Sequence, residues 1–487
     1  MSFVGLLNSS TFSFLYKLVV FIYNPFICTM KKIFAILLIS AIGNSSFSQS
    51  ITDKLKTAYA AFSKDAQLKY ATSSLIVTDR NTNKVIFAQN ENVGLAPAST
   101  LKTVTSATAL AILGEDFQFK TDILYTGSIS GNTLNGNIVI KGNGDPTLGS
   151  DRFSTTSKDI VLEKILSAIQ SKGIKKVNGE VIADDGVWDS QSISEGWIWQ
   201  DMGNYYGAGS SAICWGENEF ELRFKPATST GQDVQLLSAS VQYPFLNIIN
   251  ELKTGDSGTG DQVYGYSSPY SSVVYLRGTY AVNLNKAIRF SLPDPALAFV
   301  YDVSEALSKN GISTKGYKTT RLDTSKQNLQ GTVILSIQSP PLKDMVYHFN
   351  QKSLNLYGEQ MLRAIANDEG KTIKGGIKSL QNHWQKLGID KNTLNIYDGS
   401  GLAPANRVTS ATMANVLKWA DGQPWFTAYL NSFPLYNNMK MKSGTIGDVL
   451  AYSGYHKNYC FTIIVNNYSG TTSAMRQKMF TLLNNLK

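Results

Sequence analysis

The chain contains few histidines and few cysteines, three of each in 487 residues. It lacks the His-Glu-x-x-His and Cys-x-x-Cys spacings of common metal sites, so we expect neither a metal nor another cofactor. It also lacks the Gly-x-Ser-x-Gly elbow and the Walker-type phosphate loop, which are typical of α/β-hydrolases and of nucleotide-binding proteins. With so little histidine, a lysine is the expected base for any serine nucleophile.

Charge is not concentrated anywhere along the chain. The formal net charge is +9, and no long basic run is present, which argues against nucleic acid as a partner. Two of the cysteines, Cys214 and Cys460, are far apart in the sequence. We expect them to be core residues, although a single disulfide between them stays open.

The N-terminal residues have the pattern of a secretory signal. Lys31 and Lys32 precede the apolar run 33–42, and small polar residues follow, which is the order of a charged region, an apolar region and a cleavage site. We expect residues 1–48 to be a leader, with translation starting at Met30, and the mature protein to be periplasmic. The apolar run is too short to span a bilayer comfortably, although an N-terminal membrane anchor stays open.

The length predicts more than one domain. Residues 49–117 and 326–487 alternate helix and strand patterns, whereas 118–325 is rich in short strands and Gly/Asn turns. We therefore expect an α+β fold, in which both ends of the chain share one antiparallel sheet with flanking helices. The middle region is the expected insertion, mostly β, with a nested subdomain at 217–285.

Hydrophobic periodicity predicts the individual elements. Helices are expected at 51–70, 100–113, 158–171, 295–310, 342–352, 355–366, 376–387, 410–420 and 472–486. Strands are expected at 74–78, 84–88, 332–337, 439–442, 449–455 and 460–466.

One segment, Pro97-Ala98-Ser99-Thr100-Leu101-Lys102, combines a serine and a lysine at the start of a predicted helix. Residues three apart share a helix face, so the Ser99 hydroxyl and the Lys102 amine can meet. A neutral amine can take the proton of the hydroxyl, and burial and the helix dipole both lower the pKa of an amine. An ordinary capped helix with a surface lysine can have the same sequence, so this motif alone does not establish a catalytic serine and lysine.

Two further segments carry suitable chemistry. In 353–355 (Ser-Leu-Asn), between two predicted helices, the serine can relay a proton and the amide can hold a substrate carbonyl. In 442–445 (Lys-Ser-Gly-Thr), the lysine can attract a carboxylate, and the glycine lets an extended substrate lie along a strand. Taken singly, these segments equally describe a helix cap and a surface lysine before a turn.

Together the three segments resemble the motif set of the D-alanyl-D-alanine carboxypeptidase/endopeptidases of the class C, low-molecular-mass penicillin-binding proteins. The segments 144–148 (Gly-Asp-Pro-Thr-Leu), 206–208 (Tyr-Gly-Ala) and 398–402 (Asp-Gly-Ser-Gly-Leu) resemble other landmarks of this family. Ser443 stands where the family more often has threonine. The long insertion between Lys102 and Ser353 is also similar to the family's layout and unlike that of class A β-lactamases.

The resemblance implies a penicillin-sensitive serine DD-carboxypeptidase, a DD-endopeptidase, or both, acting on peptidoglycan stem peptides that end in D-Ala-D-Ala. It implies that Ser99 forms the acyl-enzyme and that Lys102 is the base, with Ser353 and Lys442 passing the proton to the leaving amine. β-Lactams would then be covalent inhibitors. The expected substrate-binding residues are Asn355, Ser443, Gly444 and Thr445.

The segment 197–202 (Trp-Ile-Trp-Gln-Asp-Met) resembles the stretch from which the family's inserted domain contributes an aspartate. That aspartate contacts the amino group of a diaminopimelate side chain, so the resemblance implies that Asp201 reads the substrate. A loop aspartate beside packed tryptophans is the alternative. Two other functions stay open for the chain: a non-hydrolytic wall-binding or β-lactam-sensing protein, and a β-lactamase.

Overall fold

The structure is a computed structural model that describes residues 50–321, 329–366 and 370–487, of which 55–487 belong to one unit. The leader predicted at 1–48 lies outside the described residues. Helix α3 (Ile51–Phe62) ends earlier than predicted, because Asp65 accepts the Gln67 N–H and starts a separate 3₁₀ turn, Ala66–Leu68. In the described part of the chain, no helix has both the length and the apolar character needed to cross a bilayer.

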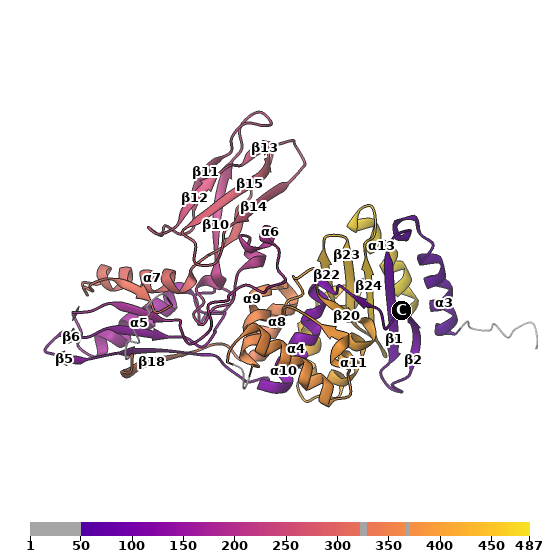
Figure 1. The fold of residues 1–487 in the computed structure, drawn as a ribbon, viewed down its shortest axis with the longest axis horizontal. Coiled ribbons are helices and arrows are strands. Elements are labelled where there is room, and N and C mark those ends of the chain that lie inside the picture. The colour runs from indigo at the N-terminus through magenta and orange to yellow at the C-terminus, as the bar shows by residue number, and fades with distance from the viewer. Residues whose placement is uncertain (1–49, 322–328, 367–369) are drawn as a thin grey trace, which may run out of the picture. The chain divides into compact units, whose positions relative to one another are not determined.

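A six-stranded sheet joins the two ends of the sequence in the order β2-β1-β24-β23-β22-β21, with every neighbouring pair antiparallel (Figure 1). The pair that joins the two ends, β1 with β24, aligns Ile76 with Thr462. This sheet confirms the predicted α+β fold. Its strands are β1 (Thr72–Asp79), β2 (Val85–Gln89), β21 (Leu435–Tyr436), β22 (Met439–Ile446), β23 (Val449–His456) and β24 (Tyr459–Asn466).

Helices cover both faces of this sheet, as the side chains of β23 show. Tyr452 packs against Phe480 of α13, whereas the Tyr455 hydroxyl donates to the Leu417 carbonyl of α11. Residues an odd number of positions apart point to opposite faces of a strand, so α13 and α11 lie on opposite sides. The helices of this part are α4 (Lys102–Leu113), α8 (Leu342–Lys352), α9 (Asn355–Ala364), α10 (Ile373–Lys386), α11 (Ser410–Asp421), α12 (Phe426–Ser432) and α13 (Thr472–Leu483).

Helix α4 is enclosed by other helices along most of its length. Every residue from Lys102 to Leu110 is buried, and the helix packs against α8, α9 and α11. Its small Ala, Ser and Thr side chains permit this close packing. Their hydroxyls donate to carbonyls of the preceding turn, as Ser106 and Thr108 do at 2.6 and 2.7 Å, so that burial leaves these hydroxyls satisfied. The helix therefore carries Lys102 into the protein interior.

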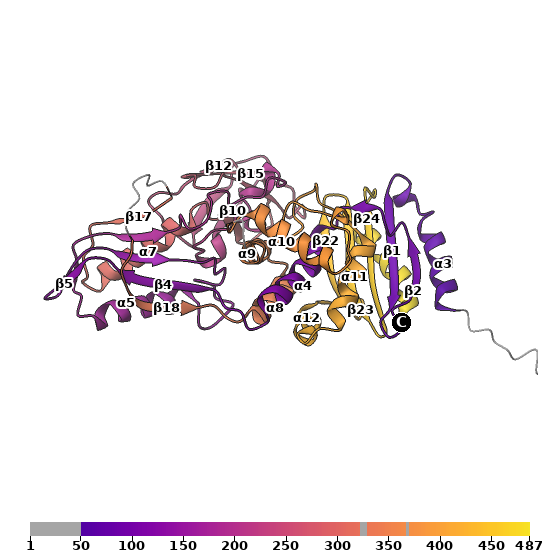
Figure 2. The ribbon, with the colours of Figure 1, turned by 60° about the horizontal axis from the view of Figure 1, so that its bottom comes forward.

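The middle of the chain builds a second body of sheets. A five-stranded sheet has the order β17-β9-β7-β4-β18, and β4 and β18 run side by side (Figure 2). The strand predicted at 332–337, which we placed in the C-terminal part, is thus bonded to this sheet. We propose that the inserted part extends to about residue 338. The sheet consists of β4 (Lys120–Tyr125), β7 (Ile138–Lys141), β9 (Val181–Asp184), β17 (Tyr317–Thr319) and β18 (Thr332–Gln338), with α5 (Lys158–Ser171) and α7 (Pro295–Lys309) nearby.

Two smaller sheets lie largely within the predicted subdomain at 217–285. One has the order β11-β10-β16, and the other joins β12, β13 and β14 to the central β15. Their strands are β10 (Glu219–Lys225), β11 (Gln235–Ala239), β12 (Asn247–Asn250), β13 (Lys253–Gly255), β14 (Asp261–Tyr266), β15 (Val273–Ala281) and β16 (Ile288–Ser291). The remaining short strands are β3 (Gly94–Leu95), β5 (Ser128–Ser130), β6 (Thr133–Asn135), β8 (Lys176–Val177), β19 (Leu394–Asn395) and β20 (Arg407–Thr409).

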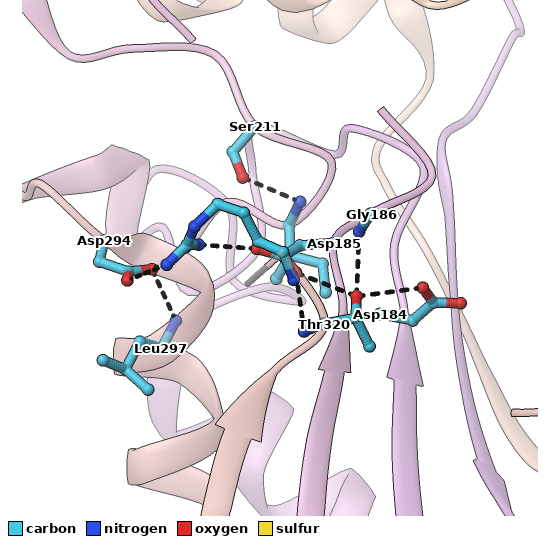
Figure 3. A network of polar contacts seen from close by, with 9 residues as sticks. Asp184, Asp185, Gly186, Ser211, Asp294, Leu297 and Thr320 are labelled. Carbon is cyan, nitrogen blue, oxygen red and sulfur yellow. Dashed lines mark hydrogen bonds and ion pairs between the residues drawn. The ribbon is translucent and has the colours of Figure 1, made fainter. Parts of the chain in front are cut away.

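A buried ion-pair network ties the last part of the insertion to its core (Figure 3). Arg321 donates to Asp185 at 2.8 Å and to Asp294 at 2.7 Å. Asp294 also caps α7 by accepting the Leu297 N–H, and Asp185 also accepts from Thr320. All three charged side chains are less than 10% exposed. Water therefore does not solvate the Arg321 charge, and the two carboxylates balance it instead.

The two cysteines within the described residues are buried and unpaired, as expected of core residues. Burial raises the pKa of both thiols above the usual range. Neither thiol is therefore set up to react as a thiolate.

Candidate active site

The predicted serine and lysine meet at the start of α4. Ser99 lies in a 3₁₀ turn, Ala98–Leu101, directly before the helix, and the Lys102 Nζ is 3.0 Å from the Ser99 Oγ. Ala98 adopts a left-handed φ of 46°, an unusual conformation for a residue with a side chain. The turn leaves Ser99 half-buried at the edge of a cleft, whereas Lys102 is fully buried.

Three oxygen atoms surround the Lys102 amine. Besides the Ser99 hydroxyl, they are the Asn355 Oδ1 at 2.7 Å and the Ser400 carbonyl at 2.6 Å. Burial lowers the pKa of Lys102 to about 7, and nearby Asp398 and Glu359 offset part of that effect. A neutral amine can donate to two of these oxygens and direct its lone pair at the third. At neutral pH the lysine can therefore accept a proton from Ser99.

Two buried acids near Lys102 were missed by the sequence analysis as functional residues. Glu359, one turn after Asn355 on α9, accepts the Gly399 N–H at 3.2 Å and the Ser400 N–H at 2.9 Å. Burial raises the pKa of Glu359 to about 8. The four-residue spacing from Asn355 was the only signal for it, because residues so spaced share a helix face.

Asp398 fixes the loop that supplies the Ser400 carbonyl. Its carboxylate accepts from the backbone N–H of Gly401 and Ala403, at 2.9 and 2.7 Å. The side chains of Trp197 and Asn406 also donate to it, both at 2.8 Å. In the sequence this segment is identified by its resemblance to the family, and the structure shows that four hydrogen bonds to Asp398 hold the loop.

The 353–355 segment lies on the same cleft. Ser353 ends α8 in a left-handed conformation, with φ of 57°, and this turn leads straight into α9 at Asn355. The Asn355 amide accepts from Lys102 and donates to the Tyr206 carbonyl at 2.7 Å. Both ends of the amide are thereby fixed, and Ser353 and Asn355 line the cleft beside Ser99.

Strand β22 passes directly against the Ser99 turn. A Cβ atom on Gly444 would lie 2.7 Å from the Pro97 carbonyl oxygen and 2.8 Å from the Ser99 nitrogen, distances that no side chain tolerates against backbone. Lys442 is buried and donates to the Ser443 carbonyl. Burial and the nearby Lys102 charge hold the pKa of Lys442 well below its usual range.

The cleft has a volume of about 620 Å³. Thr445 is exposed and lines the cleft, whereas Lys442, Ser443 and Gly444 are not among its lining residues. Asp201, on the short helix α6 (Trp199–Met202), also lines the cleft. Burial raises the pKa of Asp201 to about 6. The predicted residues that share this cleft are Ser99, Asp201, Ser353, Asn355 and Thr445.

Comparison with solved structures identifies the fold. Penicillin-binding protein 4 from Haemophilus influenzae matches with a TM-score of 0.75 at 23% sequence identity, over 88% of this chain and 98% of that chain. The same protein complexed with a β-lactam matches with a TM-score of 0.70 at 22% identity, over the same shares of the two chains. The fold is therefore that of a penicillin-binding protein.

The chain belongs to the D-Ala-D-Ala carboxypeptidase 3 (S13) family, which matches residues 55–486. It is 26% identical over 447 residues to the D-alanyl-D-alanine carboxypeptidase of Actinomadura sp. (strain R39), covering 84% of this chain and 80% of the relative. It is also 26% identical over 479 residues to D-alanyl-D-alanine carboxypeptidase DacB of Haemophilus influenzae, covering 90% and 94%. These matches confirm the predicted family and enzyme class: the protein is a serine peptidase of the D-Ala-D-Ala carboxypeptidase type.

Proposed function

We propose that this peptidase cleaves the terminal D-Ala-D-Ala bond of peptidoglycan stem peptides through an acyl-enzyme on Ser99. The observation that carries the proposal is the fully buried Lys102 amine, 3.0 Å from the Ser99 hydroxyl, with its pKa lowered to about 7 by burial. No histidine lines the cleft in the described residues, so Lys102 is the available base. The same site would split D-Ala-linked cross-bridges, which makes DD-endopeptidase activity part of the proposal.

In the acylation step, neutral Lys102 takes the proton of Ser99 as its oxygen attacks the substrate carbonyl carbon. Backbone N–H groups of Ser99 and of the Thr445–Ile446 edge of β22 would stabilise the oxyanion, and the close approach at Gly444 supports that arrangement. As the C–N bond breaks, Ser353 and Lys442 deliver the proton to the departing amine. Water then hydrolyses the ester and frees Ser99.

Substrate binding uses the rest of the set. Asn355, fixed by Lys102 and Tyr206, would hold the peptide, and Ser443 and Thr445 would hold the terminal carboxylate near Lys442. Gly444 would serve binding indirectly, because its missing side chain lets β22 lie against the Ser99 turn. The half-buried Asp201 on the cleft wall would contact the amino group of a diamino acid side chain in the stem peptide.

The family's substrate lies in the cell wall, so we propose that the leader at 1–48 exports the chain and that it works in the periplasm. β-Lactams mimic the D-Ala-D-Ala terminus and should acylate Ser99. The related penicillin-binding protein 4 that was solved in complex with a β-lactam supports this part of the proposal.

The test is to incubate purified muropeptides with the protein and to read the products by mass. Loss of one alanine from pentapeptides identifies carboxypeptidase activity, and splitting of cross-linked dimers identifies endopeptidase activity. We expect Ser99→Ala to abolish both, whereas Ser128→Ala, at an exposed serine of β5, changes neither. Intact muropeptides after incubation with a wild-type protein that penicillin acylates would contradict the proposed hydrolysis and favour a β-lactam-sensing role.

A further inference from the structure

The outward face of the sheet β12-β15-β14 carries aromatic side chains where polar ones are usual. Tyr266 is directly opposite Tyr275, and Tyr264 is opposite Arg277. Ile249 of β12 is opposite Tyr275 on its other side. Opposite residues share a face of a sheet, so these five side chains lie on one face. We call them, together with Trp199, the aromatic face.

The aromatic face is open to solvent although the other side of the same sheet is buried. Val274 and Leu276 of β15 are fully buried, whereas Tyr275 between them is 39% exposed. Ile249 and Trp199 are 41% and 51% exposed. The solvent-exposed face of an antiparallel sheet normally carries polar residues. A contiguous apolar surface usually marks an interaction site.

Contacts among the side chains hold this surface in place. The Trp199 ring lies 6.0 Å from the Tyr266 ring, and the Arg277 guanidinium lies over Tyr266 and Tyr275 at 5.5 and 5.3 Å. Arg277 also donates to Glu251 at 2.7 Å. The rings are thus prearranged, and hydrogen-bonding groups lie between them.

The aromatic face is continuous with the wall of the catalytic cleft. Helix α6 presents Trp199 to the aromatic face and Asp201 to the cleft, and it lies at the base of the β14–β15 sheet (Figure 1). Its end touches β14 closely, since a Cβ on Gly203 would lie 2.2 Å from the Gly265 carbonyl oxygen. The Gly265 N–H also donates to the Asn204 side chain. The cleft and the aromatic face are therefore joined directly through α6.

We propose that the aromatic face binds the glycan strand of peptidoglycan and so presents its stem peptides to the cleft. This inference rests on the proposed function, which supplies a substrate attached to such a strand. Pyranose rings have flat C–H faces that pack on Tyr and Trp rings, and their hydroxyl and carboxylate groups find partners in the tyrosine hydroxyls and in Arg277. An open sheet face accommodates a long polymer, which a closed pocket would not.

The experiment measures binding to purified sacculi by co-sedimentation, in a Ser99→Ala background so that the sacculi stay intact. We expect Tyr275→Ala to weaken binding about tenfold, the effect of losing a central aromatic anchor. The double variant Ile249→Ser with Tyr275→Ala should weaken binding further. Tyr70→Ala, at a 74% exposed tyrosine elsewhere, should bind as the parent does. Soluble glycan chains freed of stem peptides should compete for the parent protein.

With Ser99 restored, the same substitutions should leave penicillin acylation and D-alanine release from a soluble pentapeptide unchanged. If the proposed function is wrong, the wild-type protein itself will release no D-alanine, and this result is independent of the sedimentation experiment. Equal sedimentation of the Ile249–Tyr275 double variant and its parent would overturn the inference. Competition by free stem peptides but not by glycan would do the same. A shift in oligomeric state in place of weaker sacculus binding would assign the aromatic face to a protein interface and overturn it as well.

Discussion

At the scale of single residues, the site depends on two lysines buried close together. Lys102 and Lys442 are almost without solvent exposure, and the charge of Lys102 lowers the pKa of Lys442. Two ammonium groups in one buried site repel each other, so the arrangement favours a neutral amine on at least one of them. That amine is available as a base without any histidine.

The pKa of Lys102 predicts the pH dependence of acylation. The base must be neutral to act, so the rate should fall about tenfold per pH unit below about pH 7 and level off above it. Stopped-flow measurement of the penicillin acylation rate from pH 5 to 9 checks this pH dependence. A rate independent of pH between 5 and 7 would exclude Lys102 as the titrating base. Lys102→Met should lower the rate about a thousandfold at every pH.

Glu359 is a positioning residue that acts as a hydrogen-bond acceptor and not as a charge. Burial raises the pKa of its carboxyl to about 8, so this carboxyl is mostly protonated below pH 7. Glu359→Gln keeps an oxygen acceptor for the Ser400 N–H and should leave the pH profile and the melting temperature unchanged. Glu359→Ala releases the loop whose Ser400 carbonyl accepts from Lys102 and should slow acylation. A profile that shifts to lower pH in Glu359→Gln would contradict this role and show that the carboxylate is charged there.

At the scale of elements, the decisive contact is between β22 and the Ser99 turn. Gly444→Ala would force a Cβ against three backbone atoms, so the strand must move off the nucleophile. We expect a loss of about 1–3 kcal/mol in stability and about a hundredfold slower acylation, because the oxyanion site is displaced. Gly422→Ala is the control, since its Cβ would meet nothing closer than 3.8 Å. Acylation at the wild-type rate in Gly444→Ala would contradict this role of the strand.

The stability of the insertion depends on the buried ion pairs of Arg321. Asp294→Ala removes one acid from a buried pair and a helix cap as well, and should lower the free energy of unfolding by about 3 kcal/mol. The Lys253–Asp233 pair is exposed, so Asp233→Ala should cost less than about 0.5 kcal/mol. Urea unfolding of both variants measures the two losses in the free energy of unfolding. Similar losses would contradict the prediction, because they would mean that burial of the Arg321 network does not determine how much it stabilises the fold.

At the scale of the whole molecule, the sequence predicted what depends on local pattern. The order of the three motifs, the helix that follows Ser99 and the C-terminal strands could all be predicted from residue type and periodicity. The partner of β18 could not, because its pairing with β4 joins segments about two hundred positions apart. The role of Glu359 was equally hidden, since it depends on a loop that tertiary contacts alone bring to α9.

The same limit applies to the aromatic face. Its tyrosines are ordinary strand residues in the sequence, and only the register of β14 with β15 places them together. Its connection to the cleft depends on the close approach of Gly203 and Gly265. A catalytic site assembled from both ends of the chain and a surface built by the insertion can therefore act on one polymer.

The central claim is that Ser99 is the nucleophile. The most direct measurement is the mass of the intact protein after brief exposure to penicillin, followed by mapping of the modified peptide. The account predicts one adduct per chain, located on the peptide that contains Ser99, and no adduct in Ser99→Ala. An unmodified wild-type protein, or an adduct that persists in Ser99→Ala, would contradict it.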